Sequence, residues 1–217
     1  MPHVYWQNAD GSTPPELLTG QGNLQQNTPT SFSPDGSFLL ITRTDHTDTS
    51  PANTGPDIFV LPLGGEKKPH PFLQTESWEG SARFSPDGRW VSYRSTESGR
   101  FEVYVRPFPG PGARWQISTE GGADERWSRS GRELFYWQAD KMMAVDVETK
   151  PTFRPTRPRT LFEGRGYHRN YYGWRYDVAP DGRFLMIKPD PAESGPAQVR
   201  VILNWFEDVQ RRVPGAK

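Results

Sequence analysis

Acidic residues recur a few positions upstream of a repeated four-residue motif, and their carboxylates are the side chains best suited to chemistry. Glu79 stands six residues before one copy of the motif, and Asp124 and Glu125 stand four and three residues before the next. Hard cations such as Ca²⁺ are bound through carboxylate oxygens, so these three residues are candidate metal ligands. Two carboxyl groups at a suitable separation can also act as general acid and base on an ester or a glycoside.

Aromatic residues accompany these carboxylates. Trp78 precedes Glu79, and Tyr172 and Trp174 lie at the corresponding place before the last copy of the motif. Aromatic faces attract cationic ligands and offer flat surfaces to sugars. Alternatively, the carboxylates form ion pairs with arginines such as Arg83, Arg126 or Arg175. They would then only neutralise charge in the channel and bind no ligand. The candidate ligand-binding set is Trp78, Glu79, Asp124, Glu125, Tyr172 and Trp174.

Only one of the four histidines is placed to join this site. His168 lies in an aromatic-rich segment before the last copy of the motif, whereas His3, His46 and His70 fall in a terminus or in loops. Glu79, Asp124 and His168 are therefore the candidate catalytic residues of a metal-assisted hydrolase. No Gly-x-Ser-x-Gly motif is present, which argues against a serine hydrolase of the α/β type.

The repeated motif itself is a turn. Ser-Pro-Asp-Gly occurs at Ser33–Gly36 and Ser85–Gly88, and altered copies occur at Ser128–Gly131 and Ala179–Gly182. Proline fixes φ, aspartate bonds to nearby backbone N–H groups, and glycine takes the position with positive φ. The aspartates are therefore expected to be structural. The third positions of successive copies are 52, 43 and 51 residues apart, a spacing typical of propeller blades.

Strand-like segments flank each turn in a pattern of four strands per repeat, which predicts an all-β propeller of about five blades. The first repeat shows only its last two strands, so the ring is completed within one chain or by a second chain in a homodimer, or the sequence is the tail of a longer gene. The loops that lead into each innermost strand are expected to line the mouth of the central channel. The predicted units are a half blade at 1–22, blades at 23–75, 76–119, 120–163 and 164–206, and a short helix-like tail at 207–217.

Composition restricts the classes of partner. Lys plus Arg and Asp plus Glu number 26 each, so the chain has no net charge that would favour nucleic acid or an anionic membrane. Only 33% of residues are hydrophobic, but 13% are aromatic, and aromatic side chains supply large buried areas. No cysteine is present, which excludes disulfides and thiolate chemistry. With no signal peptide and no membrane-spanning segment, we expect a cytoplasmic protein as expressed.

Several longer segments resemble the PD-type, WD-like repeats of TolB-like propellers. They include the seven residues from Asp57, the ten from Ala82, the eleven from Glu102, the six from Gly131 and the nine from Val201. The chain most resembles the C-terminal propeller of bacterial serine/threonine protein kinases. It contains neither the glycine-rich loop nor the His-Arg-Asp loop of a kinase, so the resemblance implies a fold and no kinase activity.

The sequence therefore predicts a non-catalytic module that binds a protein or a small molecule at the channel mouth. The alternative is a metal-assisted hydrolase of esters, lactones, phosphotriesters or glycosides acting in the channel. Ca²⁺ is the cofactor that this alternative implies.

Overall fold

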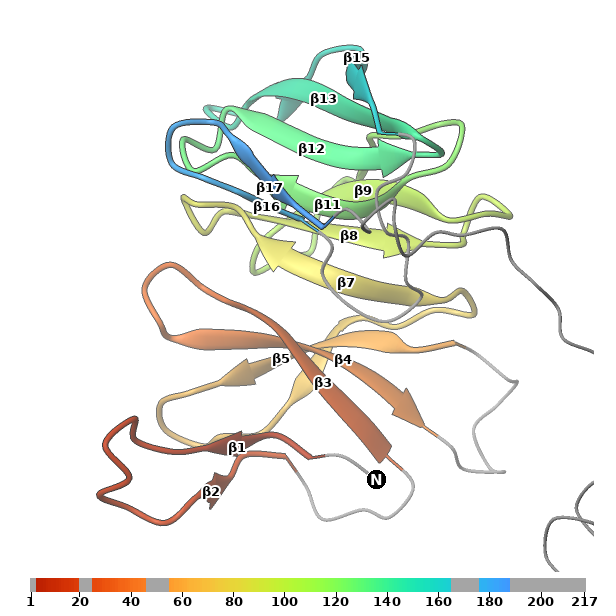
Figure 1. Ribbon diagram of the computed structural model, residues 1–217. Helices are drawn as coiled ribbons and strands as arrows, with labels where there is room; N and C mark the ends of the chain where they lie inside the picture. Colours follow the sequence, from red (N-terminus) through yellow and green to blue (C-terminus); the bar gives the residue numbers. More distant parts are fainter. Residues whose placement is uncertain (1–2, 20–24, 46–54, 165–175, 188–217) are drawn as a thin grey trace, which may run out of the picture.

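Five antiparallel sheets follow one another along the chain in a computed structural model that describes residues 3–19, 25–45, 55–164 and 176–187. They are arranged as successive blades, from β1–β2 (red) through β3–β5 (orange) and β7–β9 (yellow to green) to β11–β13 (green), with β16–β17 (blue) beside β11 (Figure 1). The described residues contain no helix. They therefore contain no helix that could cross a membrane. The all-β prediction is confirmed, and the architecture is that of a β-propeller.

Three sheets are complete blades. In the first two, the strands pair in chain order. The first contains β3 (Gln25–Phe32), β4 (Phe38–Asp45), β5 (Asp57–Pro62) and β6 (His70–Leu73). The second contains β7 (Glu79–Phe84), β8 (Trp90–Ser95), β9 (Glu102–Pro107) and β10 (Trp115–Gln116). The third contains β11 (Ala123–Trp127), β12 (Glu133–Gln138), β13 (Lys141–Glu148), β14 (Arg154–Pro155) and β15 (Arg159–Glu163).

The third blade departs from the predicted four strands because β13 is eight residues long. One end of β13 pairs with β14, and the other end pairs with β15. At the two ends of the described chain, β1 (Tyr5–Trp6) pairs with β2 (Glu16–Leu17), and β16 (Tyr176–Val178) pairs with β17 (Phe184–Met186). The segments 198–205 and 207–217 lie outside the described residues, so closure of the ring by one chain or by two stays a prediction.

The repeated motif forms the turn between the first and second strands of each blade. In the first turn, Ser33 Oγ donates to Asp35 Oδ1 at 2.5 Å, and the backbone N–H of Ser37 donates to the same oxygen at 3.0 Å. Gly36 has a φ of 72°, which a side chain would disfavour. In the altered third turn, Ser130 takes the place of the aspartate, with its hydroxyl 3.1 Å from Ser128 Oγ. The turn aspartates are structural, as predicted.

Successive turns also pack against each other. A Cβ atom placed on Gly88 would lie 3.3 Å from Cδ of Pro34 in the preceding turn. A Cβ atom on Gly131 would lie 3.5 Å from Cδ of Pro86, so the same proline–glycine contact joins the next two turns. Gly182, which follows the turn that has lost its proline, has no such neighbour within 4 Å.

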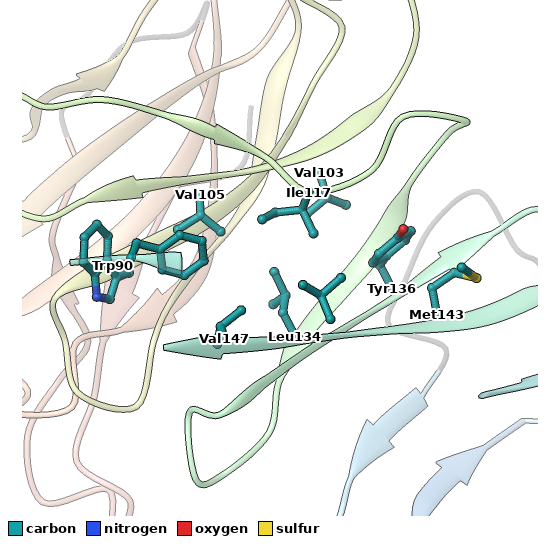
Figure 2. Packing of buried hydrophobic residues seen from close by; sticks show 10 residues of the cluster. Trp90, Val103, Val105, Ile117, Leu134, Tyr136, Met143 and Val147 are labelled. Carbon is teal, nitrogen blue, oxygen red and sulfur yellow. The ribbon is translucent and has the colours of Figure 1, made fainter. Parts of the chain in front are cut away.

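The hydrophobic core lies between successive sheets rather than inside any one of them. The largest cluster joins Trp90, Val103 and Val105 of one blade to Leu134 and Tyr136 of the next (Figure 2). Because strand side chains alternate between faces, neighbours on the same strands point the other way and build the next interface. Among these, Phe135 and Met142 pack with Tyr176 of β16.

Candidate functional site

The innermost strands begin earlier than the sequence pattern predicts, and this changes where the candidate residues lie. Glu79 is the first residue of β7, and Asp124 and Glu125 lie within β11 rather than in a preceding loop. Each strand contains a β-bulge, between Gly80 and Arg83 in β7 and between Ala123 and Arg126 in β11. The extra residue interrupts the alternation of apolar and polar residues. The sequence pattern therefore does not predict a strand for the residues before the bulge.

The bulges place a non-glycine residue at positive φ in both strands. Ser81 has a φ of 59° and Asp124 a φ of 55° at the equivalent position of the next blade. Such a conformation is uncommon for residues other than glycine, asparagine and aspartate. Glu125 follows the bulge residue Asp124, just as Ala82 follows Ser81 in β7. Glu125 and Ala82 therefore occupy equivalent positions, and both are fully buried.

Glu125 is a carboxyl group in a cationic environment. It is 0% exposed, and neither of its carboxyl oxygens has a hydrogen-bond partner among the described residues. Burial raises the pKa of Glu125 to about 7 because an apolar environment disfavours the charged form. The backbone N–H of Glu125 itself opposes this shift most strongly, followed by three nearby guanidinium groups, those of Arg94, Arg83 and Arg126.

The arginines come from the innermost strands of two blades and from the neighbouring β8. Burial lowers the pKa of Arg83 to about 10, and the like charge of Arg126 acts in the same direction. The Arg126 guanidinium lies 5.5 Å from the ring centre of Tyr176, and its Nη1 donates to the backbone oxygen of Glu125 at 2.9 Å. The predicted pairing of carboxylates with Arg83 and Arg126 is therefore electrostatic at Glu125, without a hydrogen bond to its carboxyl oxygens.

Tyr176 is a site residue that was absent from the predicted set. It is buried in β16, its hydroxyl has no hydrogen-bond partner among the described residues, and burial raises the pKa of that hydroxyl. Its position three residues before the last turn matches that of Glu125 before the third turn, which is the signal that could have identified it.

Glu79 belongs to a separate group at the interface between the first two complete blades. Its carboxyl accepts a hydrogen bond from the Thr75 hydroxyl and lies close to the carboxyl of Asp57, at the start of β5. Gln74 Nε2 donates to Asp57 Oδ2 at 3.0 Å. Burial raises the pKa of both carboxyls, that of Glu79 to about 7. Glu79 Oε2 and Asp57 Oδ1 have no hydrogen-bond partner among the described residues, and the nearby charge of Asp57 adds to the rise in the pKa of Glu79.

Trp78 is held as a packing residue by two glycines. A Cβ atom on Gly80 would lie 2.8 Å from Trp78 Cη2, and one on Gly55 would lie 2.7 Å from Trp78 Cδ1. The Arg94 guanidinium lies 4.7 Å from the ring centre of Trp78 and 4.4 Å from that of Phe101. Trp78 thus helps to position one of the three guanidiniums around Glu125.

We expect the substitution Gly80→Ala to destabilise the protein by about 1–3 kcal/mol, because the new methyl group would overlap the Trp78 ring. Urea unfolding followed by tryptophan fluorescence measures this change. Gly64→Ala is the matched control, since a Cβ atom there meets nothing within 4 Å. Equal midpoints for the two variants would contradict the packing described for Trp78.

The predicted metal ligands do not gather into one centre. Among the described residues, no group of three or more His, Cys, Asp or Glu side chains could hold a metal ion. The carboxyl of Glu79 lies with Asp57, whereas Glu125 lies among arginines. His168, Tyr172 and Trp174 fall outside the described residues.

Comparison with known proteins bears on the fold. No family model and no curated protein matches this sequence. Among solved structures, the chain is similar to TolB from Acinetobacter baumannii, with 21% identity and a TM-score of 0.53, covering 88% of this chain and 49% of TolB. The fold is therefore that of a TolB-like β-propeller.

Two structures of enzymes show the same fold. An oligogalacturonate lyase from Vibrio parahaemolyticus is 10% identical, with a TM-score of 0.63, covering 88% of this chain and 54% of the lyase. An oligogalacturonate lyase in complex with manganese is 14% identical, with a TM-score of 0.61, covering 84% and 52%. This chain spans about half the length of the solved structures that it matches. At these identities the likeness concerns the fold alone.

Proposed function

We propose that this propeller is a non-catalytic binding module whose ligand or protein partner contacts the N-terminal ends of the innermost strands β7, β11 and β16. The observation that carries the proposal is the carboxyl of Glu125, which is fully buried among three guanidiniums and accepts no hydrogen bond from any other described residue. A buried polar group without a partner costs free energy, and a bound donor relieves that cost.

The groups around Glu125 favour a polar ligand that carries both hydrogen-bond donors and hydrogen-bond acceptors. The Tyr176 hydroxyl is a second buried group without a described partner, and its ring lies against Arg126. Carboxyl, hydroxyl and guanidinium groups together can hold both the donors and the acceptors of one ligand. Trp78, Glu79 and Asp124 extend the proposed surface, together with Tyr172 and Trp174 from outside the described residues.

A thermal-shift screen of amino acids, oligosaccharides and peptides tests this proposal, since a ligand that binds the native state raises the melting temperature. We expect a ligand that stabilises the native protein and fails to stabilise Glu125→Gln, which keeps the shape of the side chain and removes its charge. Glu120→Gln is the control, because Glu120 is exposed in the same segment of chain. If every stabilising ligand acts equally on both variants, the site lies elsewhere.

The alternative function is a metal-assisted hydrolase, with Glu79, Asp124 and His168 as its catalytic residues. The fold alone links this alternative to the manganese-bound lyase. It requires turnover on an ester, lactone, phosphotriester or glycoside panel, loss of that turnover with chelator, and an increase in melting temperature with millimolar Ca²⁺ or Mn²⁺. A binding module shows none of these three results.

A further inference from the structure

The last described hairpin, β16–β17 (blue in Figure 1), pairs one residue out of step with its counterparts in the three complete blades. In those blades the residue before the turn pairs with the third residue after the turn glycine: Phe32 with Leu39, Phe84 with Val91, and Trp127 with Leu134. In the last hairpin Val178 pairs with Phe184, the second residue after Gly182. The backbone bond that closes the turn agrees. The N–H of the first turn residue donates to the fifth residue after it in the complete blades, but to the fourth, Arg183, in the last hairpin.

A serine hydroxyl holds the longer register in the complete blades. It accepts the N–H of the fifth residue after the serine, in the pairs Ser33 with Phe38 at 2.9 Å, Ser85 with Trp90 at 3.0 Å and Ser128 with Glu133 at 3.0 Å. The last turn begins with Ala179, which has no hydroxyl. Its aspartate bond is retained, because Asp181 Oδ1 accepts the Arg183 N–H at 3.2 Å. The missing hydroxyl is therefore the local cause of the different register.

A shift of one residue turns the side chains of β17 to the opposite faces of its sheet. In the three complete blades the third and fifth residues after the turn glycine pack against the preceding sheet. They are Leu39, Ile41, Val91, Tyr93, Leu134 and Tyr136. Leu185 and Ile187 hold the same positions in β17 but are 75% and 55% exposed. Phe184 and Met186 face the preceding sheet instead.

The described register packs against the preceding sheet without filling the space. The ring centre of Phe184 lies 5.0 Å from that of Phe135, yet a cavity of about 310 Å³ remains beside them, with Leu161 and Val178 in its wall. All residues from Phe184 to Ile187 are apolar, so either register points two apolar side chains at the preceding blade. Hydrophobic burial, which normally fixes the register of a strand, therefore does not select one register here.

We propose that β16–β17 is a two-register switch. The described register leaves Leu185 and Ile187 on the surface. A one-residue slip of β17 restores the register of the other blades, buries these two side chains against the preceding sheet and turns Phe184 and Met186 outward. In the slip Tyr176 exchanges its cross-strand neighbour Met186 for Ile187, so the switch reaches the binding surface described above. That link rests on the proposed function, whereas the switch itself does not.

Pairs of introduced cysteines report the register, because the chain has no cysteine of its own. Asp177 lies opposite Leu185 in the described register and lies opposite Met186 after the slip. Opposed residues have Cα atoms about 4.5–5.5 Å apart, within the range of a disulfide. Under mild oxidation we expect the pair D177C/L185C to close, and D177C/M186C to close about tenfold more slowly, because the slipped register is the minor one. D177C/I187C, opposed in neither register, is the control and should stay reduced.

The substitution Ala179→Ser supplies the missing hydroxyl and should favour the slipped register. In that register the N–H of Phe184, the fifth residue after the serine, donates to the new Oγ. We expect closure of D177C/M186C to increase about fivefold relative to that of D177C/L185C, the effect of one hydrogen bond. Ala179→Val adds bulk without a hydroxyl, so it is the matched control and should leave the ratio unchanged.

Hydrogen exchange provides a second measurement that needs no cysteine. Ala179→Ser should slow exchange of the Phe184 amide about fivefold relative to Ala179→Val. Closure of D177C/L185C alone, with no response of either measurement to Ala179→Ser, would overturn the switch and show that other contacts fix the register. Glu125→Gln, which tests the proposed binding function, should change neither measurement, so the two proposals fail separately.

Discussion

Lowering the pH from about 8 to about 5 should make this protein harder to unfold, and the buried carboxyls of Glu125 and Glu79 should cause the change. Burial raises the pKa of Glu125 to about 7, from an ordinary value of 4.5. Between these two values the native state binds more protons than the unfolded state, so the free energy of unfolding falls as pH rises. The shift corresponds to about 3 kcal/mol, fully present below pH 4.5 and lost as pH passes 7. The raised pKa of Glu79 acts in the same direction.

Urea unfolding at a series of pH values measures this dependence. Glu125→Gln should reduce the slope to the part that comes from Glu79, and it should be more stable than the native protein at about pH 8, because a buried amide has no cost of ionisation. The exposed carboxyl of Glu120 provides the matched control, and Glu120→Gln should retain the native slope. Parallel curves for the native protein and Glu125→Gln would show that Glu125 is ionised in the native state across this range.

The substitution Phe153→Ala should destabilise the protein by about 3–5 kcal/mol, the cost of a large cavity in a packed core. Phe153 is 2% exposed in the segment between β13 and β14. Its ring centre lies 5.1 Å from that of Trp90, 5.3 Å from that of Trp115 and 6.3 Å from that of Trp127. One side chain thus joins the aromatic residues of two successive blades.

Near-ultraviolet circular dichroism and urea unfolding together test this expectation, since the three tryptophans would lose a common neighbour. Phe32→Ala is the control, because Phe32 is 54% exposed and should cost less than about 1 kcal/mol. A loss for Phe153→Ala as small as that for Phe32→Ala would mean that the blades are held together elsewhere.

The repeated turn was enough to predict most of the fold. Its spacing placed the strands on either side of Ser33–Gly36 and Ser85–Gly88, because proline, aspartate and glycine each serve a local geometry that any copy must satisfy. The bulges in β7 and β11, before the turns at Ser85 and Ser128, were not predicted. They depend on the pairing of β7 with β8 and of β11 with β12, which no local pattern encodes.

The candidate site was predicted only in part for the same reason. Glu125 was identified by its distance from a turn, but the neighbours that decide its chemistry, such as Arg94 and Tyr176, come from other strands. Asp57 was missed as the partner of Glu79. Glu102 occupies the same place at the start of the third strand in the next blade and there accepts hydrogen bonds from Ser118 and Gly121, so an acid at this position is a recurring feature.

The contact between successive turns bears on how such a chain can lengthen. Each joint needs a proline from one turn and a glycine from the next, and each intact turn carries both. A duplicated blade inserted between Pro34 and Gly88 would bring its own proline and glycine, so both new joints would be satisfied without any compensating change elsewhere. Gene duplication can therefore add a blade at the intact joints without changes in the rest of the chain. The joint after the turn that contains Arg129 differs. The glycine of a blade inserted there would face Arg129 instead of a proline, so the contact would not form.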